Sequence, residues 1–238
     1  MKILLVKDDQ QFTDQLKENL KQHRYIVDIA RDGQEGWEFV EAQEYDLIIL
    51  DMMLAKLDGI SFCNRLRGKG LQVLVLFLST RSTSTDKIKG LDAGADDYVV
   101  QPIPLPELIA RIRALLCRKN TTVSTILEWG NLCLEPKIAE VKYAGVSLNL
   151  TKKEYSLLEL FMRDAQRIHS QNSILNQLWS FEDEQPTRDT IRTLIKRVRQ
   201  KLKAAKAPDL IETVFGVGYR LNPLFKTSSL KDYHYQLI

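Results

Sequence analysis

The stretch Leu47-Ile48-Ile49-Leu50-Asp51 decides the fold of this chain: four apolar residues end in a carboxylate. The segment Ile3-Leu4-Leu5-Val6 has the same form and is followed by Asp8 and Asp9. Such runs are typical of buried strands in a parallel sheet, where reactive groups collect at the carboxyl ends of the strands. Neighbouring carboxylates repel unless a proton or cation joins them. The pattern therefore predicts a site for a hard, oxygen-binding cation beside a reactive aspartate.

Strands and helices alternate through the first half of the chain. Apolar strand segments lie at residues 3–6, 25–30, 47–50, 73–78 and 98–100. Apolar residues at helical spacing separate them, and another such stretch follows the last. Five strands joined by right-handed crossover helices predict a doubly wound α/β domain with a five-stranded parallel sheet of the flavodoxin-like type.

Charge and cysteine content indicate two domains with different partners. Residues 1–120 hold 17 Lys and Arg against 18 Asp and Glu, a net −1, and the remainder holds 17 against 13, a net +4. The three cysteines, Cys63, Cys117 and Cys133, lack metal-ligand spacing and indicate reduced thiols. No stretch approaches the roughly 20 apolar residues of a membrane span, and the start does not resemble a signal peptide. We expect a cytoplasmic protein without a membrane partner.

The second half predicts short strands, three helices and a hairpin. Strands are expected at residues 127–129, 132–134, 139–141 and 146–148, and helices at 151–161, 173–179 and 187–206. Thr151 and Glu154 have capping-box spacing at the first helix. From Arg188 to Lys206 there are eight basic residues and one acid, a net +7. On the last helix, one face is apolar and another carries Arg192, Lys196, Arg199 and Lys203.

A cationic helix face can neutralise phosphates and place arginine on base edges in a major groove. Surface helices usually mix charges, so a merely solvated face is the weaker interpretation. Binding to a membrane surface is a rival, but the apolar stripe is needed for packing on the other two helices. A hairpin follows through Gly216-Val217-Gly218. Three helices with a terminal hairpin predict an α+β winged-helix domain whose third helix reads DNA.

The chain resembles response regulators of the OmpR/PhoB type, which join a receiver domain to a winged-helix DNA-binding domain. The resemblance covers all but the last dozen or so residues. The matching stretches are Ile3–Asp9, Asp46–Gly59, Gly90–Val99, Leu150–Leu160 and Gly216–Leu221. It implies a receiver at residues 1–118, a linker at 119–125, a winged-helix domain at 126–223 and a C-terminal tail at 224–238.

The resemblance also implies the chemistry of the receiver. Asp51 falls on the phosphoacceptor position. Asp8, Asp51 and the backbone carbonyl of Met53 match the ligands of a Mg²⁺ ion. Ser79 takes the position of the switch hydroxyl that hydrogen-bonds the phosphate, and Tyr98 that of the switch aromatic. A carboxylate attacking a phosphoryl group and a cation neutralising the transferring oxygens make chemical sense together.

Two residues depart from the family pattern in this pocket. Lys7 stands where the family has an acidic residue, and Gln101 stands where it has a lysine that pairs with the phosphate. Glutamine supplies no charge, and an ammonium in place of a carboxylate weakens Mg²⁺ binding. We hypothesise that Lys7 reaches Asp51 and does part of the work of the metal and of the missing lysine. The alternative is that Lys7 points into solvent and phosphotransfer is merely slower.

Positions on two further surfaces match functional positions of the family. For DNA contact the candidates are Arg192, Lys196, Arg197, Arg199 and Lys203 on the predicted third helix and Arg220 on the hairpin. For the dimer interface, the matching pairs are Lys89 with Glu107 and Asp97 with Arg111. Such exposed pairs fix register more than they add affinity. Phe215 stands where many members carry an arginine that enters the minor groove.

These features predict a DNA-binding transcriptional regulator of a two-component phosphorelay, not an enzyme. It would act as a homodimer through the receiver on double-stranded DNA, with a sensor histidine kinase as phosphodonor. One alternative is a transcription regulator controlled without phosphorylation. A metal-dependent aspartyl phosphohydrolase would use Asp8 and Asp51 but leave the basic helix unused. A phosphate-sink adaptor that no longer binds DNA is a further alternative.

Overall fold

The computed structural model describes residues 1–118, 126–136, 138–181 and 186–226. The expected linker at 119–125 and residues 227–238 of the expected tail lie outside this range. Two compact units make up the chain, one built mainly on residues 1–118 and the other mainly on residues 126–226. No helix among the described residues is long and apolar enough to cross a membrane.

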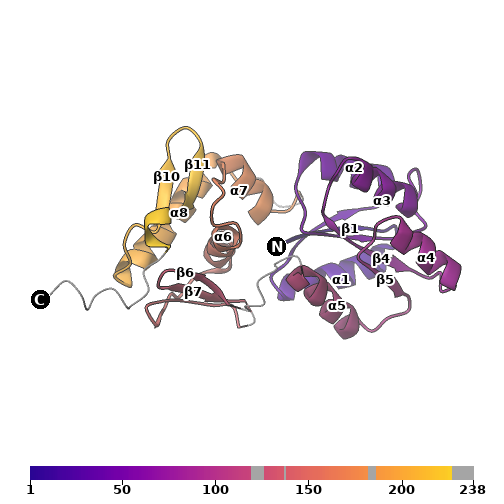
Figure 1. Ribbon diagram of the computed structural model, residues 1–238, viewed down its shortest axis with the longest axis horizontal. Helices are drawn as coiled ribbons and strands as arrows, with labels where there is room; N and C mark the ends of the chain where they lie inside the picture. Colours follow the sequence, from indigo (N-terminus) through magenta and orange to yellow (C-terminus); the bar gives the residue numbers. More distant parts are fainter. Residues whose placement is uncertain (119–125, 137, 182–185, 227–238) are drawn as a thin grey trace, which may run out of the picture. The chain divides into compact units, whose positions relative to one another are not determined.

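The first unit is a five-stranded parallel sheet with the strand order β2-β1-β3-β4-β5. Its strands are β1 (Lys2–Val6), β2 (Ile26–Ala30), β3 (Leu47–Leu50), β4 (Leu74–Ser79) and β5 (Asp97–Val100). Its helices are α1 (Gln10–Gln22), α2 (Gly33–Ala42), α3 (Gly59–Gly68), α4 (Ser84–Asp92) and α5 (Leu105–Arg118). Figure 1 shows α2 and α3 on one side of this sheet and α1 and α5 on the other. Each predicted strand boundary lies within one residue of the observed one. The doubly wound fold is confirmed.

Helices cover both faces of this sheet, which is why its central strands are fully buried. Helices α1 and α5 pack on one face against residues such as Leu5 and Ile49. Helices α2 and α3 pack on the other face against Leu4 and Leu50. Burial on both sides explains why the strands read as continuous apolar runs rather than alternating ones.

Side-chain caps fix where the helices of the first unit begin. The Asp9 carboxylate accepts a hydrogen bond from the Phe12 N–H at 3.0 Å and starts α1. Asp32 and Asp58 cap α2 and α3 in the same way. Short oxygen-bearing side chains are favoured at this position because they satisfy the first unpaired N–H groups of a helix. Each cap closes a connection near the carboxyl end of a strand.

The second unit has a four-stranded antiparallel sheet, three helices and a hairpin. The sheet contains β6 (Leu127–Trp129), β7 (Leu132–Glu135), β8 (Glu140–Tyr143) and β9 (Val146–Ser147). The remaining elements are α6 (Lys152–Arg163), α7 (Gln171–Leu178), α8 (Arg188–Ala204), β10 (Ile211–Val214), β11 (Gly218–Leu221) and the 3₁₀ turn Pro223–Phe225. The strand predicted at 139–141 lies at Glu140–Tyr143 instead, because Ala139 has φ +52° in the preceding turn.

Three helices share one apolar core in this unit. Leu157 and Phe161 of α6, Ile174 of α7, and Ile191 and Val198 of α8 are buried together. The predicted capping box at Thr151 and Glu154 is present. The expected apolar stripe of α8 therefore faces the core, and its basic residues lie on other faces. This is the winged-helix fold expected from the sequence.

Candidate functional site

The carboxyl ends of β1 and β3 bring Lys7 and Asp51 together. The two strands are paired in register, with Val6 opposite Leu50, and the Asp51 N–H donates to the Val6 carbonyl at 3.0 Å. Lys7 Nζ lies 2.5 Å from Asp51 Oδ2, and their side chains are only 8% and 9% exposed. Lys7 therefore forms a buried ion pair with Asp51 in this structure and does not point into solvent.

Both carboxylate oxygens of Asp51, the central residue of the expected Mg²⁺ site, already have partners in this structure. Asp51 Oδ2 is bonded to Lys7, and Asp51 Oδ1 accepts the Met53 N–H at 3.0 Å. Asp8 is exposed, whereas the Asp9 carboxylate caps α1. Among the described residues, no group of three or more His, Cys, Asp or Glu side chains could hold a metal ion. An ammonium beside the carboxylate makes this pocket a poor fit for a divalent cation.

The switch candidates Ser79 and Tyr98 both hydrogen-bond to the backbone of Arg81. The buried Ser79 Oγ accepts the Arg81 N–H at 3.2 Å. The Tyr98 hydroxyl donates to the Arg81 carbonyl at 2.9 Å. Burial raises the pKa of Tyr98 above its ordinary value, so the hydroxyl keeps its proton as a donor. Gln101 lies next to them, and its N–H donates to the Ser79 carbonyl at 2.8 Å. The sequence pattern did not indicate that the Arg81 backbone links Ser79 to Tyr98.

Glycine is required where α3 starts beside the acceptor. A Cβ at Gly59 would lie 2.2 Å from the Asp51 carbonyl oxygen, too close for any side chain. The Gly59 N–H also donates to the Met52 carbonyl at 3.1 Å. The turn after β3 is therefore held tightly against the first residues of α3. This fixes the backbone that carries Asp51.

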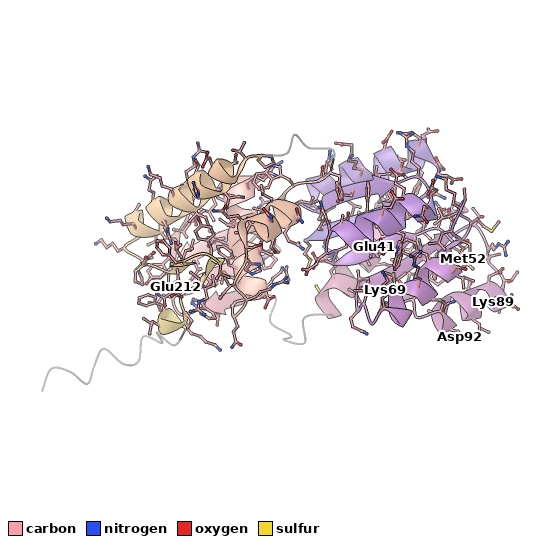
Figure 2. The ribbon with its side chains drawn as sticks, turned by 90° about the horizontal axis from the view of Figure 1, so that it is seen from above. Glu41, Met52, Lys69, Lys89, Asp92 and Glu212 are labelled. Carbon is pink, nitrogen blue, oxygen red and sulfur yellow. The ribbon has the colours of Figure 1, made fainter. Side chains whose placement is uncertain are left out.

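The four dimer candidates lie on α4, β5 and α5. Lys89 is exposed on α4, and Figure 2 labels it together with Asp92 of the same helix. Arg111 pairs within its own chain, with Glu107 at 2.9 Å and with Asp97 at 3.5 Å. The predicted pairing across two chains remains a prediction. Exposed apolar side chains accompany these charges, with Ile88 57% and Leu91 48% exposed.

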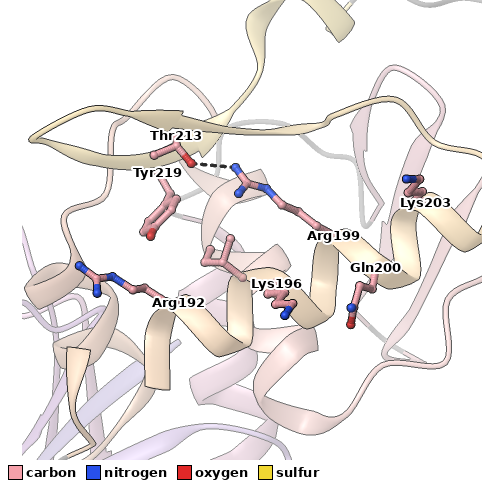
Figure 3. Close-up of a pocket in the computed structure, with 8 residues that line it drawn as sticks. Arg192, Lys196, Arg199, Gln200, Lys203, Thr213 and Tyr219 are labelled. Carbon is pink, nitrogen blue, oxygen red and sulfur yellow. Dashed lines mark hydrogen bonds between the residues drawn. The ribbon is translucent and has the colours of Figure 1, made fainter. Parts of the chain in front are cut away.

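The basic face of α8 lines a shallow groove with the hairpin in the second unit. Figure 3 shows the predicted side chains at helical spacing along α8, opposite Thr213 and Tyr219 of the hairpin. The groove has a volume of about 340 Å³. The lining residues are Arg192, Ile195, Lys196, Arg199, Gln200, Lys203, Thr213 and Tyr219. The structure thus brings four of the six DNA-binding candidates together on one surface.

Known families match both units. Residues 3–113 match the response regulator receiver domain, and residues 145–221 match the C-terminal domain of transcriptional regulatory proteins. The chain is 35% identical to the response regulator MprA of Mycobacterium tuberculosis over 224 residues, covering 93% of this chain and 97% of MprA. It belongs to the OmpR/PhoB-type response regulators. It is thus a two-component response regulator with a DNA-binding effector domain.

Two further similarities concern this response regulator. Protein RcaC of Microchaete diplosiphon is 51% identical over 222 residues, which is 93% of this chain and 34% of RcaC. The chain thus spans about a third of that relative. The solved structure of DrrB, an OmpR/PhoB homologue from Thermotoga maritima, is 26% identical and has a TM-score of 0.45. The match covers 93% of this chain and 98% of the DrrB chain.

The basic residues of the effector domain differ in their contacts. Lys196, Arg197 and Lys203 are exposed on α8. Arg199 instead donates to the Ile211 carbonyl at 2.6 Å and to the Thr213 hydroxyl at 2.9 Å, which fastens α8 to the hairpin. Charge counting did not indicate this structural role.

Two ion pairs also hold basic residues of the effector domain. Arg220 on the hairpin pairs with Glu212 at 2.7 Å. Lys201 pairs with the buried Glu154 of α6 at 2.7 Å. Burial acts to raise the pKa of Glu154, but the Lys201 ammonium and the Thr151 N–H together hold it below its ordinary value. Part of the positive charge of α8 therefore stabilises the domain.

The hairpin presents an apolar tip. Phe215 is 97% exposed and Val217 54% exposed. Close to this tip, β11 is fixed because His169 and Tyr219 exchange two backbone hydrogen bonds, at 2.8 and 2.9 Å. A Cβ at Gly218 would lie 2.0 Å from the His169 carbonyl oxygen. Glycine is therefore needed for this close approach.

Proposed function

We propose that this response regulator binds double-stranded DNA through the exposed face of α8 and is controlled through Asp51 of its receiver. In this proposal the receiver spans residues 1–118, the linker 119–125, the winged-helix domain 126–223 and the tail 224–238. The single observation that carries the DNA assignment is the groove lined by four basic side chains of α8. The protein would act in the cytoplasm.

The division of labour on α8 supports DNA as the ligand. Its apolar stripe is buried against α6 and α7, so that stripe is not available for a membrane surface. Its exposed face carries Lys196, Arg197 and Lys203. Phosphate neutralisation by such side chains releases counterions and makes affinity fall with salt. In a major groove, Arg192 and Arg197 would reach base edges or phosphates, and Arg220 on the hairpin would make a separate contact to the DNA.

Salt-dependent binding to a duplex tests the DNA assignment. We expect the purified chain to shift a random-sequence duplex in a gel, with an affinity that falls steeply with salt. Lys196→Ala and Lys203→Ala should each weaken binding and reduce the slope of log K against log salt by about 0.9, the value for one phosphate contact. The matched control is Lys21→Ala, an exposed lysine of α1 in the first unit. Absence of binding, or a slope that these variants leave unchanged, would refute the assignment.

In the receiver, we assign Asp51 as the phosphoacceptor. A carboxylate oxygen of Asp51 attacks the phosphorus of the donor, a sensor histidine kinase, and the bond from phosphorus to the donor breaks with its electron pair leaving on the donor. Ser79 would then hydrogen-bond the new phosphate. Ser79 and Tyr98 both hydrogen-bond to the Arg81 backbone. A new bond from Ser79 to the phosphate would therefore change the position of Arg81 and, through it, that of Tyr98.

The dimer follows from the same proposal. Lys89, Asp97, Glu107 and Arg111 would pair across two receivers in place of the present intrachain pairs of Arg111. Two winged helices would then bind tandem half-sites about one helical turn apart. The exposed Ile88 and Leu91 would add apolar area to this interface.

A second candidate is a DNA-binding regulator controlled without phosphorylation. The observation that favours it is the buried ion pair, because Lys7 engages the Asp51 oxygen that would otherwise attack the donor. Intact-mass analysis after treatment with a small phosphodonor separates the two candidates. A phosphate adduct that Asp51→Ala abolishes supports the phosphorelay. An unmodified protein that still dimerises and binds DNA supports the second candidate.

A further inference from the structure

We propose that Lys7 is a resident cation that takes the place of Mg²⁺ at the acceptor, so that the receiver pocket excludes divalent cations. This inference rests on the proposed role of Asp51. The match to the receiver family implies a Mg²⁺ ion at the acceptor for phosphorylation. Here the cationic group is part of the chain. The charge of Asp51 would hence be paired permanently, and the pocket would not respond to the concentration of free metal.

Lys7 is held in place by its surroundings. Its backbone N–H donates to the Ala30 carbonyl at 3.0 Å, which anchors the residue to the end of β2. The ammonium lies 5.9 Å from the centroid of the Phe12 ring on α1. The residue is only 7% exposed. A lysine held in this way keeps its charge on the carboxylate of Asp51 rather than in solvent.

Both oxygens of the acceptor already have partners. Asp51 Oδ2 receives the Lys7 ammonium at 2.5 Å, and Asp51 Oδ1 receives the Met53 N–H at 3.0 Å. A metal ion at Asp51 would have to displace the ammonium or sit beside it, and like charges at that distance repel. Mg²⁺ also demands near-ideal octahedral geometry and gives up its waters reluctantly. Both effects oppose metal entry.

The charges of the pocket lead to the same conclusion. With an acidic residue at position 7, three carboxylates would gather here and call for a divalent cation. With Lys7, the side chains of residues 7, 8 and 51 sum to −1. Gln101 carries no charge, so Lys7 is the cationic side chain that the structure places on Asp51. The two departures from the family pattern thus compensate each other.

Metal binding by the full-length chain tests the inference without any activity assay. Free Mn²⁺ is followed by its electron paramagnetic resonance signal during titration, with Mg²⁺ as competitor. We expect no saturable site on the wild type in the millimolar range. Lys7→Asp should gain a saturable site whose affinity exceeds the upper limit for the wild type by about tenfold or more, since affinity follows the number of ligand charges. Lys21→Asp makes the same charge change at an exposed position of α1 and should gain none.

Three results would overturn the inference. One is a wild-type site as tight as that of Lys7→Asp. Another is a folded Lys7→Asp variant, judged by circular dichroism, that gains no site. If Lys7→Asp does not fold, Lys7→Gln replaces it, and a wild-type affinity equal to that of Lys7→Gln counts against the inference. Absence of a phosphate adduct on Asp51 would refute its proposed role as phosphoacceptor but leave these titrations unchanged, so the two failures are distinguishable.

Discussion

Replacement of Lys7 by methionine should strongly destabilise the first unit. The change keeps most of the side-chain volume but removes the ammonium. The carboxylate of Asp51 would then remain in a site where its side chain is 9% exposed, with the Met53 N–H as its hydrogen-bond donor. We expect a loss of about 3–5 kcal/mol in the free energy of unfolding of this unit, as is typical when one partner of a buried ion pair is removed.

The size of the effect follows from two opposing terms. At 2.5 Å the attraction between Lys7 Nζ and Asp51 Oδ2 amounts to about 6–7 kcal/mol at an effective dielectric constant of about 20. Desolvation costs several kcal/mol for each ion. The intact pair is therefore close to neutral, whereas a single remaining charge keeps its desolvation penalty and loses the attraction. The double variant Lys7→Met with Asp51→Asn should lie within about 1–2 kcal/mol of the wild type.

Hydrogen exchange measures this effect in the correct part of the molecule. A chain with two compact units need not unfold in one step, so a single melting temperature would mix them. Exchange rates of the buried amides of β1 and β3, read by mass spectrometry, report the free energy of opening of the first unit. Lys21→Met should change this value by less than about 0.5 kcal/mol, because Lys21 is exposed. A loss below about 1 kcal/mol for Lys7→Met would refute the buried pair.

Two further predictions concern the second unit. The lowered pKa of Glu154 stabilises this unit fully above its ordinary value of 4.5, and the stabilisation is lost as the pH falls through the lowered pKa. Lys201→Met should therefore make the thermal midpoint of the second unit fall less steeply below pH 4.5. An equally steep fall in the variant would exclude the ion pair between Lys201 and Glu154 as the cause. Gly218→Ala should cost about 1–3 kcal/mol of stability and weaken duplex binding, because its Cβ would overlap the His169 carbonyl. Unaltered stability in urea would show that the hairpin can move aside.

Much of the fold was predictable because local signals agreed with the tertiary structure. The runs Ile3–Val6 and Leu47–Leu50 became central strands since only a sheet covered on both faces buries such runs. The capping box at Thr151 and the two faces of α8 likewise depend on spacing within one helix. The strand predicted at 139–141 was displaced because a turn residue with positive φ carries no clear mark in the sequence.

The contacts of individual charges were less predictable. Lys7 could be placed near Asp51 from the strand ends, but its burial depends on the packing of α1 and on Phe12. Arg199 lies on the predicted basic face yet bonds to the backbone of Ile211, because the hairpin packs against that part of α8. A charge pattern predicts a face of a helix. It does not specify which carbonyl or carboxylate from a distant segment will meet each side chain.

The role of Lys7 as the cation of the receiver pocket is tested most directly by the rate at which a small phosphodonor modifies the full-length chain. This rate is followed by intact mass with Mg²⁺ and with a chelator. We expect one phosphate adduct, absent in Asp51→Ala, that forms at the same rate under both conditions because Lys7 supplies the charge that a metal ion would otherwise bring. Lys7→Asp should make the rate depend on Mg²⁺. An adduct on the wild type that forms only with Mg²⁺, or one that persists in Asp51→Ala, would contradict this expectation.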